Sequence, residues 1–551
     1  MPLVSYSDLT SVDLDYIVVG GGTSGLTPVA RLSENSNLNV LVIEAGVRHG
    51  PTPEIDIPAE SSCNLAAKAL GNNFMGMFCP PKSEMNALEQ DFGMKRWNWD
   101  NLLHYMKKIS LKFAAKPNLA FHGTDGPLQI SYGPTDTTMP LKPFETAEKL
   151  GMPWNFDSVR RIHTEPASVT SILTIDTNTA TRSYAANAYS EPNLHRKNLL
   201  VLTEAQVTKV LLEGQGSLLR ATGVEFVQNG QTLCIENVKR DVVLSTGSFQ
   251  TPQLLELSGV GNPDILSKHG IKTLVYLPGV GENLRGYIGV CTVAECETDD
   301  ETPDILAGPD VIKLHEDLYR EKKEGLFAST PPGAFIFAPA SALGTKEEVE
   351  SWKRQAEARS TDALVNAIPL LQWAGRQPMP YVPPAEPGKR YTSFFCALMH
   401  PLSRGNVHIA SADPLAPPAI NSSYFADETD FDLCVHILEY MLQLLRTPPL
   451  GLQVKSSLVP SQTLIDRGTE GFRKYVKEFC GPVYHPVGTA AMMAHEDGGV
   501  VDAELRVYGT NNLRIVDVSV LPLEVSCHTQ SLAYAIGEKA ADMLKTEAAE
   551  I

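Results

Sequence analysis

Short apolar runs and a helical stretch alternate at the start of the chain. Residues 16–19 (YIVV) are four consecutive apolar residues, and Gly20 follows them directly. A short apolar run that ends at a glycine is typical of a strand buried on both faces. A stretch with helical spacing comes next, and a second apolar run (NVLVI) leads to Glu44. The pattern predicts a strand–helix–strand unit with parallel strands, as in α/β folds.

Three glycines stand where the first strand should turn into the helix. They form the pattern G-x-G-x-x-G, which permits a tight turn, close approach of a pyrophosphate and close packing of helix on strand. Glu44, at the end of the second strand, is placed to accept hydrogen bonds from a ribose. The predicted dinucleotide site consists of Gly20, Gly22, Thr23, Ser24, Gly25 and Glu44. The alternative is a glycine-rich turn in an α/β domain that binds no dinucleotide.

Pro28 disagrees with a regular helix after this turn. Proline lacks an N–H group, and its ring clashes with the preceding turn, which costs about 3 kcal/mol in a helix interior. We therefore expect the helix either to kink at Pro28 or to begin later than the glycine motif indicates.

Composition and charge restrict the class of protein. A chain of 551 residues is long enough for two or more domains. The formal net charge of −18 argues against nucleic acid or an anionic membrane as a partner. We find no apolar run of membrane-spanning length and no basic, apolar leader, so a cytoplasmic location is predicted, with a peroxisome or another intracellular site open. Nine dispersed cysteines without a C-x-x-C pair indicate a reducing compartment and no metal site.

A family resemblance extends over most of the chain. The segment GSFQTPQLLELSGVG (247–261) resembles a signature of the glucose–methanol–choline (GMC) flavoprotein oxidoreductases. The segments LPGVGENL (277–284), YHPVGTAAM (484–492) and GGVVDAELRVYGTNNLRIVDVSVLP (498–522) are similar to later parts of the same family, in the same order. The match is best with its aryl-alcohol oxidase and glucose oxidase branch, and it implies FAD as the cofactor.

The resemblance also implies the fold. It is an α/β chain in which a Rossmann-like FAD domain is interleaved with an α+β substrate domain built on an antiparallel sheet. The FAD domain is expected at residues 11–150, 196–290 and 481–551, and the substrate domain at residues 151–195 and 291–480. In the substrate domain, two segments are strand-like: RYTSFFCALMH (390–400) and NVHIAS (406–411). The Pro/Gly-rich residues 371–390 are expected to form a loop.

Two histidines near the C-terminus are the expected catalytic residues. His485 and His528 stand at motif positions where the family places a histidine and a second histidine or asparagine beside the flavin ring. Oxidation of an alcohol needs a base for the hydroxyl proton while hydride leaves carbon, and an imidazole that titrates near neutrality suits that role. We expect His485 to be the general base and His528 to orient the hydroxyl group and stabilise the developing alkoxide. A purely structural role for both is the alternative.

Further cofactor contacts follow from the resemblance. Val207 corresponds to a strand whose backbone contacts adenine, and Asp517 to a residue near the ribityl chain. Asn73, Phe74 and Met75 correspond to a segment that passes near the flavin. For Val207 the alternative is plain strand core, and for Asp517 it is a turn or cap carboxylate.

One segment departs from the family in the region that should hold the phosphates. In ALGNNFMG (69–76) a second glycine and the following hydroxyl residues are missing, and residues 46–71 are shorter than usual. The pair Gly286-Tyr287 replaces the usual Asp-His. Lost hydrogen bonds to phosphate cost roughly 1.5–3 kcal/mol each. The chain either binds FAD more loosely, or is a decayed or mis-spliced product, or has turned to a non-redox reaction.

The leading functional hypothesis is an FAD-dependent oxidoreductase that oxidises a primary or secondary alcohol, aromatic or from secondary metabolism. The alternative is a lyase, cyclase or dehydratase that uses His485 and His528 as an acid–base pair, with FAD structural or lost. A catalytically silent binding protein is disfavoured because both histidines are present. A small molecule is the expected partner, and the sequence leaves the substrate, the electron acceptor and the oligomeric state open.

Overall fold

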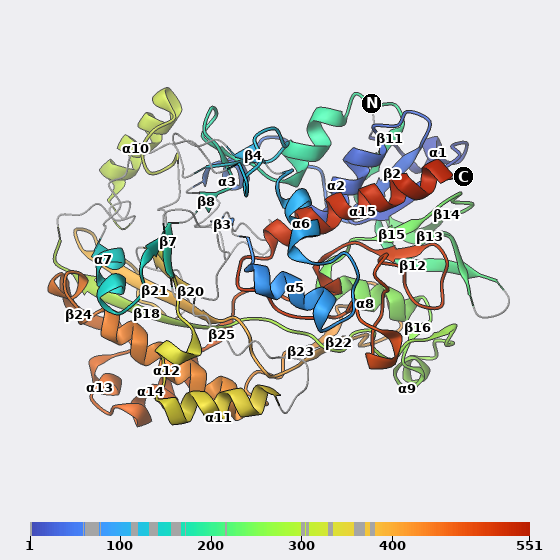
Figure 1. Ribbon diagram of the computed structural model, residues 1–551. Coiled ribbons are helices and arrows are strands. Elements are labelled where there is room, and N and C mark those ends of the chain that lie inside the picture. Colours follow the sequence, from blue (N-terminus) through green and yellow to red (C-terminus); the bar gives the residue numbers. More distant parts are fainter. Residues whose placement is uncertain are drawn as a thin grey trace.

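Two sheets with helices packed on them form most of the molecule (Figure 1). A computed structural model describes residues 3–58, 60, 76–77, 79–108, 110–111, 119–131, 142–155, 167–170, 172–214, 218–298, 304, 308–328, 334–357, 370–374 and 381–550. The expected flavin contacts Asn73, Phe74 and Met75 lie outside these residues, as does most of the shortened segment 46–76 from residue 61 onward.

The first sheet is parallel and contains the predicted strand–helix–strand unit. Its strand order is β11 (Leu199–Leu202), β2 (Val40–Ile43), β1 (Tyr16–Val19), β15 (Val242–Leu244) and β26 (Leu513–Ile515). All of these strands pair in parallel, and their residues are buried. Apolar side chains on both faces account for the uninterrupted apolar runs in the sequence. The predicted strands at 16–19 and at the run before Glu44 are confirmed.

Helix α2 (Thr23–Leu32) follows β1 directly, so the expectation of a later start is wrong. Pro28 lies inside α2 and gives no N–H to the carbonyl of Ser24, four residues earlier. The C-terminal helix α15 (Gln530–Glu550) covers this position. A Cβ built on Gly537 would lie 2.7 Å from the Ser24 carbonyl oxygen, so only glycine fits here. The Ser24 hydroxyl donates a hydrogen bond to the carbonyl oxygen of Ala533 at 3.0 Å, which also joins α2 to α15.

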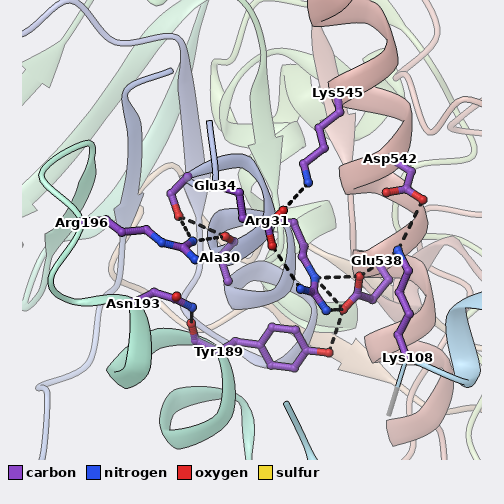
Figure 2. A network of polar contacts seen from close by, with 11 residues as sticks. Ala30, Arg31, Glu34, Lys108, Tyr189, Asn193, Arg196, Glu538, Asp542 and Lys545 are labelled. Atoms are coloured by element: carbon purple, nitrogen blue, oxygen red, sulfur yellow. Dashed lines mark hydrogen bonds and ion pairs between the residues drawn. The ribbon is translucent and has the colours of Figure 1, made fainter. Parts of the chain in front are cut away.

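A buried carboxylate also joins α15 to α2 (Figure 2). Glu538 is 1% exposed and accepts hydrogen bonds from Nε and Nη2 of Arg31, at 2.9–3.1 Å. The Tyr189 hydroxyl donates to it at 2.9 Å, and Lys108 Nζ lies 3.3 Å away. Because the two helices pack closely and share this network, the end of the chain fixes the helix that starts at the glycine turn.

The second sheet is larger and almost wholly antiparallel. Its path is β24 (Val454–Val459), β18 (Ile288–Cys296), β21 (Arg390–Leu398), β20 (Leu370–Ala374), β19 (Ala334–Phe337), β7 (Ala167–Thr170) and β6 (Trp154–Asn155), and β25 (Gly481–Pro482) pairs with β18. Only β6 and β7 pair in parallel. Helices α12 (Glu428–Leu444) and α14 (Thr469–Phe479) pack on this sheet through an apolar core of their own.

The remaining elements are shorter or peripheral. A three-stranded antiparallel sheet contains β12 (Gln206–Glu213), β13 (Arg220–Gln228) and β14 (Gln231–Ile235). The other helices are α1 (Tyr6–Leu9), α3 (Pro53–Asp56), α5 (Lys82–Gln90), α6 (Trp99–Met106), α7 (Lys142–Lys149), α8 (Gly247–Leu257), α9 (Pro263–Leu266), α10 (Pro309–Lys322), α11 (Lys346–Glu357) and α13 (Gln462–Ile465). Paired short strands are β3 (Gly76–Met77) with β8 (Ile172–Leu173), β4 (Ser110–Leu111) with β5 (Gln129–Ile130), β9 (Ile175–Asp176) with β10 (Thr181–Arg182), β16 (Val260–Gly261) with β17 (Val275–Tyr276) and β22 (Asn406–His408) with β23 (Ala419–Asn421).

The predicted α/β fold class is confirmed, with a Rossmann-like parallel sheet and a second, antiparallel one. The boundaries of the two domains stay a prediction. The strand predicted in RYTSFFCALMH is β21, whereas the strand in NVHIAS is β22 and pairs only with β23. The loop expected at 371–390 is wrong at its start, because Leu370–Ala374 form β20, which lies between β21 and β19 in the large sheet. Within the described residues, no helix is long and apolar enough to cross a membrane.

Candidate active site

Two adjoining cavities lie at the carboxyl ends of the parallel strands, where ligands bind in open α/β sheets. The first has a volume of about 370 Å³ and the second about 340 Å³. Gly22, Ser245 and Thr246 line both, so the two cavities adjoin at the glycine turn. The first is also lined by Val19, Gly20, Glu44, Ala205, Val207 and Gln250, and the second by Thr23, Ser24, Arg182, Tyr184, Tyr484, His485, Asp517, His528 and Tyr534.

The glycine turn between β1 and α2 is shaped as the sequence predicts. Gly20 has φ +102°, and a Cβ there would lie 2.4 Å from the carbonyl oxygen of Ser245. A Cβ on Gly25 would lie 2.1 Å from the carbonyl oxygen of Gly20. A Cβ on Gly22 would meet nothing within 4 Å, because this position faces the cavities. The N-terminus of α2 therefore opens onto space in which a pyrophosphate fits.

Glu44 and Val207 lie together in the first cavity. The Glu44 carboxylate accepts hydrogen bonds from the N–H groups of Gly21 at 2.6 Å and Gly46 at 2.7 Å. Each carboxylate oxygen has a second lone pair, so the side chain can still accept a ribose hydroxyl. Strand β2 ends at Ile43, which brings Glu44 to the sheet edge. The first cavity therefore suits the adenosine end of a dinucleotide.

Asp517 lies in the second cavity and follows β26. Its buried carboxylate accepts hydrogen bonds from the Gly247 N–H at 3.0 Å, the Thr251 hydroxyl at 2.8 Å and the Ser519 N–H at 2.8 Å. Burial raises the pKa of Asp517, although these donors act in the opposite direction. The side chain joins the end of β26 to the start of α8, where the helix dipole favours a negative charge.

His485 and His528 meet in the second cavity. Nδ1 of His528 lies 2.9 Å from Nε2 of His485, and the ring centroids are 4.9 Å apart. His485 Nδ1 lies 2.6 Å from the carbonyl oxygen of Val483, which can only accept. This contact assigns the proton of neutral His485 to Nδ1 and leaves a lone pair on Nε2. The hydrogen bond between the rings is then donated by His528 Nδ1–H.

Burial sets the charge of His485. The ring is buried, and burial lowers its pKa to about 4, against the smaller opposite effect of the Val483 carbonyl. At neutral pH the ring is therefore uncharged and can accept a proton. Strand pairing fixes the place of His485, since β25 ends at Pro482, three residues before His485, and pairs with the start of β18.

The structure brings most of the predicted site residues to these two adjoining cavities. Gly20, Glu44 and Val207 line the first, Thr23, Ser24, His485, Asp517 and His528 the second, and Gly22 both. Gly25 supports the turn from inside α2. Sequence reasoning missed several lining residues. Tyr484 stands directly before His485 in the motif and could have been found, whereas Arg182 and Tyr184 come from the segment 151–195 that was assigned to substrate binding.

Comparison with known proteins decides the family. Sequence models described as GMC oxidoreductase match residues 14–287 and residues 401–537 of the chain. The chain belongs to the GMC oxidoreductase family. As a GMC oxidoreductase it is a flavoprotein enzyme with FAD as its cofactor, as the resemblance implied, and the open turn at Gly22 fits that group.

Relatives of this GMC oxidoreductase match along nearly its whole length. The dehydrogenase mpl7 of Monascus purpureus is 29% identical over 631 aligned positions, which cover 99% of this chain and 98% of the relative. A glucose oxidase of Aspergillus carbonarius is 30% identical, and the alignment covers 96% of this chain and 92% of that relative. The structure of formate oxidase of Aspergillus oryzae superposes with a TM-score of 0.84 at 26% identity, and the superposition covers 98% of this chain and 99% of the formate oxidase chain. The alignment with mpl7 is longer than the 551 residues of this chain, so the relative carries residues that this chain lacks.

Two glycine substitutions separate folding from cofactor binding. Gly25→Ala is expected to lower the free energy of unfolding by about 1–3 kcal/mol or more, because the added Cβ collides with the backbone oxygen of Gly20. Gly22→Ala is the matched control; it has room for its Cβ and costs at most about 1 kcal/mol as an N-cap change, but should weaken FAD binding. Urea unfolding and flavin retention on a desalting column measure both effects. Equal stability of the two variants would contradict the packing argument.

Proposed function

We propose that this GMC oxidoreductase oxidises the CH–OH group of a small-molecule alcohol, with His485 as general base and His528 as its hydrogen-bonding partner. The observation that carries the proposal is the 2.9 Å contact between the two imidazoles in the cavity that the N-terminus of α2 also lines. The glucose oxidase among the relatives supports an alcohol as the substrate.

The proposed role of His485 follows from its protonation. Its Nδ1–H is held by the Val483 carbonyl, so Nε2 carries the lone pair that points toward His528. A base must be uncharged to accept a proton, and the low pKa keeps His485 uncharged throughout the neutral range. A substrate hydroxyl that donates to Nε2 would transfer its proton there as the C–H bond breaks.

The proposed role of His528 is to act on the oxygen of the same hydroxyl. Its Nδ1–H now points at Nε2 of His485. A hydroxyl group inserted between the rings would accept from Nδ1–H of His528 and donate to Nε2 of His485, at the cost of a wider ring separation. The donor would then stabilise the alkoxide as it forms.

The proposed cofactor contacts begin at Glu44 and Val207, at the adenosine end. They continue at the pyrophosphate with Gly20, Gly22, Thr23 and Ser24, where Gly25 packs against Gly20 from inside α2, and they end at Asp517 and the histidines. When bound, FAD supplies the acceptor for the hydride. Tyr484 is 59% exposed in the cavity lining and offers a stacking surface for an aromatic alcohol, which the sequence also favoured. A role in secondary metabolism and a cytoplasmic location stay predictions.

An absorption spectrum tests the proposal. Purified protein is expected to show flavin bands that bleach when an aromatic or aliphatic alcohol is added without oxygen, because hydride transfer reduces the flavin. A panel of alcohols is compared with the corresponding aldehydes as controls. A colourless protein that does not take up added FAD would contradict the redox assignment and favour the lyase or cyclase alternative.

A further inference from the structure

Tyr287 is the residue that stands where the family usually has histidine, and it contacts both catalytic segments. It is fully buried immediately before β18. Its ring stacks on the imidazole of His485, with centroids 5.1 Å apart and an angle of 21°. Its backbone carbonyl accepts a hydrogen bond from the Val483 N–H at 3.3 Å, and Val483 in turn holds Nδ1 of His485.

The hydroxyl group of Tyr287 reaches the segment that leads to His528. It donates to the carbonyl oxygens of Val525 and of Cys527, the latter at 2.7 Å. These carbonyls belong to a tight turn in which the Cys527 N–H bonds to Val525 O at 2.7 Å. Since Cys527 directly precedes His528, the hydroxyl group fixes the backbone from which the second imidazole projects.

The opposite side of this turn is held by α5. Glu84 is 1% exposed and accepts the Ser526 N–H at 2.7 Å together with the Ser526 hydroxyl. His400 Nε2 lies 2.9 Å from the Ser526 hydroxyl oxygen. The other ionisable groups around the turn are Glu524, Arg285 and Arg404. Burial raises the pKa of Glu524 well above its usual value, although the two arginines and the Tyr287 hydroxyl act in the opposite direction. The turn is therefore held between a carboxylate on one side and the Tyr287 hydroxyl on the other.

We propose that Tyr287 is a positioning residue that sets the separation of His485 and His528, through its ring on the first imidazole and its hydroxyl group on the backbone of the second. This inference rests on the proposed function only where turnover is measured. Loss of the hydroxyl group frees the 525–527 turn and lengthens the bond between the rings. His485 then loses the hydrogen bond that His528 donates to Nε2 of its neutral ring, and water reaches the ring. Both changes favour protonation of His485.

The test compares Tyr287→Phe with Tyr475→Phe. Tyr475 is also buried and donates to a backbone carbonyl, that of Cys291 at 2.6 Å, but it lies on α14. The protein is produced with ¹³Cε1-labelled histidine, and His485, assigned by its loss in His485→Ala, is titrated by NMR. Y287F is expected to raise the pKa of His485 by about one unit, and Y475F to leave it unchanged.

Turnover gives a second readout. With an alcohol that reduces the flavin, Y287F is expected to lower kcat by about 10- to 100-fold with little change in KM, because the groups are displaced rather than lost. The acid limb of the kcat/KM profile should move by the same amount as the NMR titration. If no alcohol is oxidised by the unmodified enzyme, the proposed function fails, while the titration still decides the role of Tyr287.

An unchanged pKa of His485 in Y287F would overturn the proposal. An equal shift in Y475F would also overturn it, because it would mean that loss of any buried tyrosine hydroxyl loosens the structure around His485. If Y287F does not fold, Tyr287→His takes its place. An imidazole keeps a ring beside His485 but is too short to reach both carbonyls, so the same shift is expected.

Discussion

Replacing His485 with alanine is expected to lower kcat/KM for alcohol oxidation by about 10²–10⁴-fold, which is the usual contribution of a general base. The flavin bands should remain, because the substitution removes the lone pair on Nε2 and leaves the glycine turn and Glu44 in place. Stopped-flow measurement of flavin reduction without oxygen isolates this step from reoxidation. His104→Ala, at an exposed position of α6, is the control and should react like the unmodified protein.

The pH dependence of the same reaction follows from the low pKa of His485. The base works only when uncharged, so the rate should be constant above pH 5 and fall as the pH drops through about 4. In H485A this acid limb should disappear. A residual rate that keeps the limb would show that another group is the base.

Replacing Glu538 with alanine is expected to lower the free energy of unfolding by about 3–5 kcal/mol, the usual cost of removing one partner of a buried ion pair. Arg31, Lys108 and the Tyr189 hydroxyl would all lose the carboxylate that they share. Urea unfolding followed by circular dichroism measures the change.

Glu34→Ala provides the control within the same network. Glu34 pairs with Arg31 at 3.1 Å and with Lys545 at 2.7 Å, but its side chain is 41% exposed. Exposed ion pairs contribute at most about 1 kcal/mol, so this variant should be nearly as stable as the unmodified chain. A similar loss in both variants would contradict the dependence on burial.

The sequence predicted those parts of the fold that depend on neighbours in the chain. The run at 16–19 and the glycines after it sufficed for the turn, because apolar continuity and the need for Gly20 at φ +102° are local properties. The family motifs around His485 and His528 supplied the histidine pair, which the structure brings to 2.9 Å. Their catalytic role stays a prediction.

Contacts between distant segments could not be predicted in the same way. Tyr287 stood out only as a departure from the family, because its partners lie about 240 residues further along the chain. Pro28 disagreed with a regular helix that starts at the glycine turn, but α2 includes it, and Gly537 lets α15 pack closely against the Ser24 carbonyl, to which proline donates no N–H. Residues 371–390 looked like a loop because their Pro/Gly content outweighed the signal of residues 371–374, which enter the large sheet as part of β20.

The position of α15 has a consequence for biosynthesis. The first strand and helix leave the ribosome early, but the strand at Leu513–Ile515 and the helix at Gln530–Glu550 that complete their layer are translated much later. The face of α2 that packs on α15 therefore stays uncovered in the nascent chain until those later segments have been synthesised. Transiently exposed apolar surface favours aggregation, so we expect a chaperone to bind the nascent strand–helix unit during synthesis.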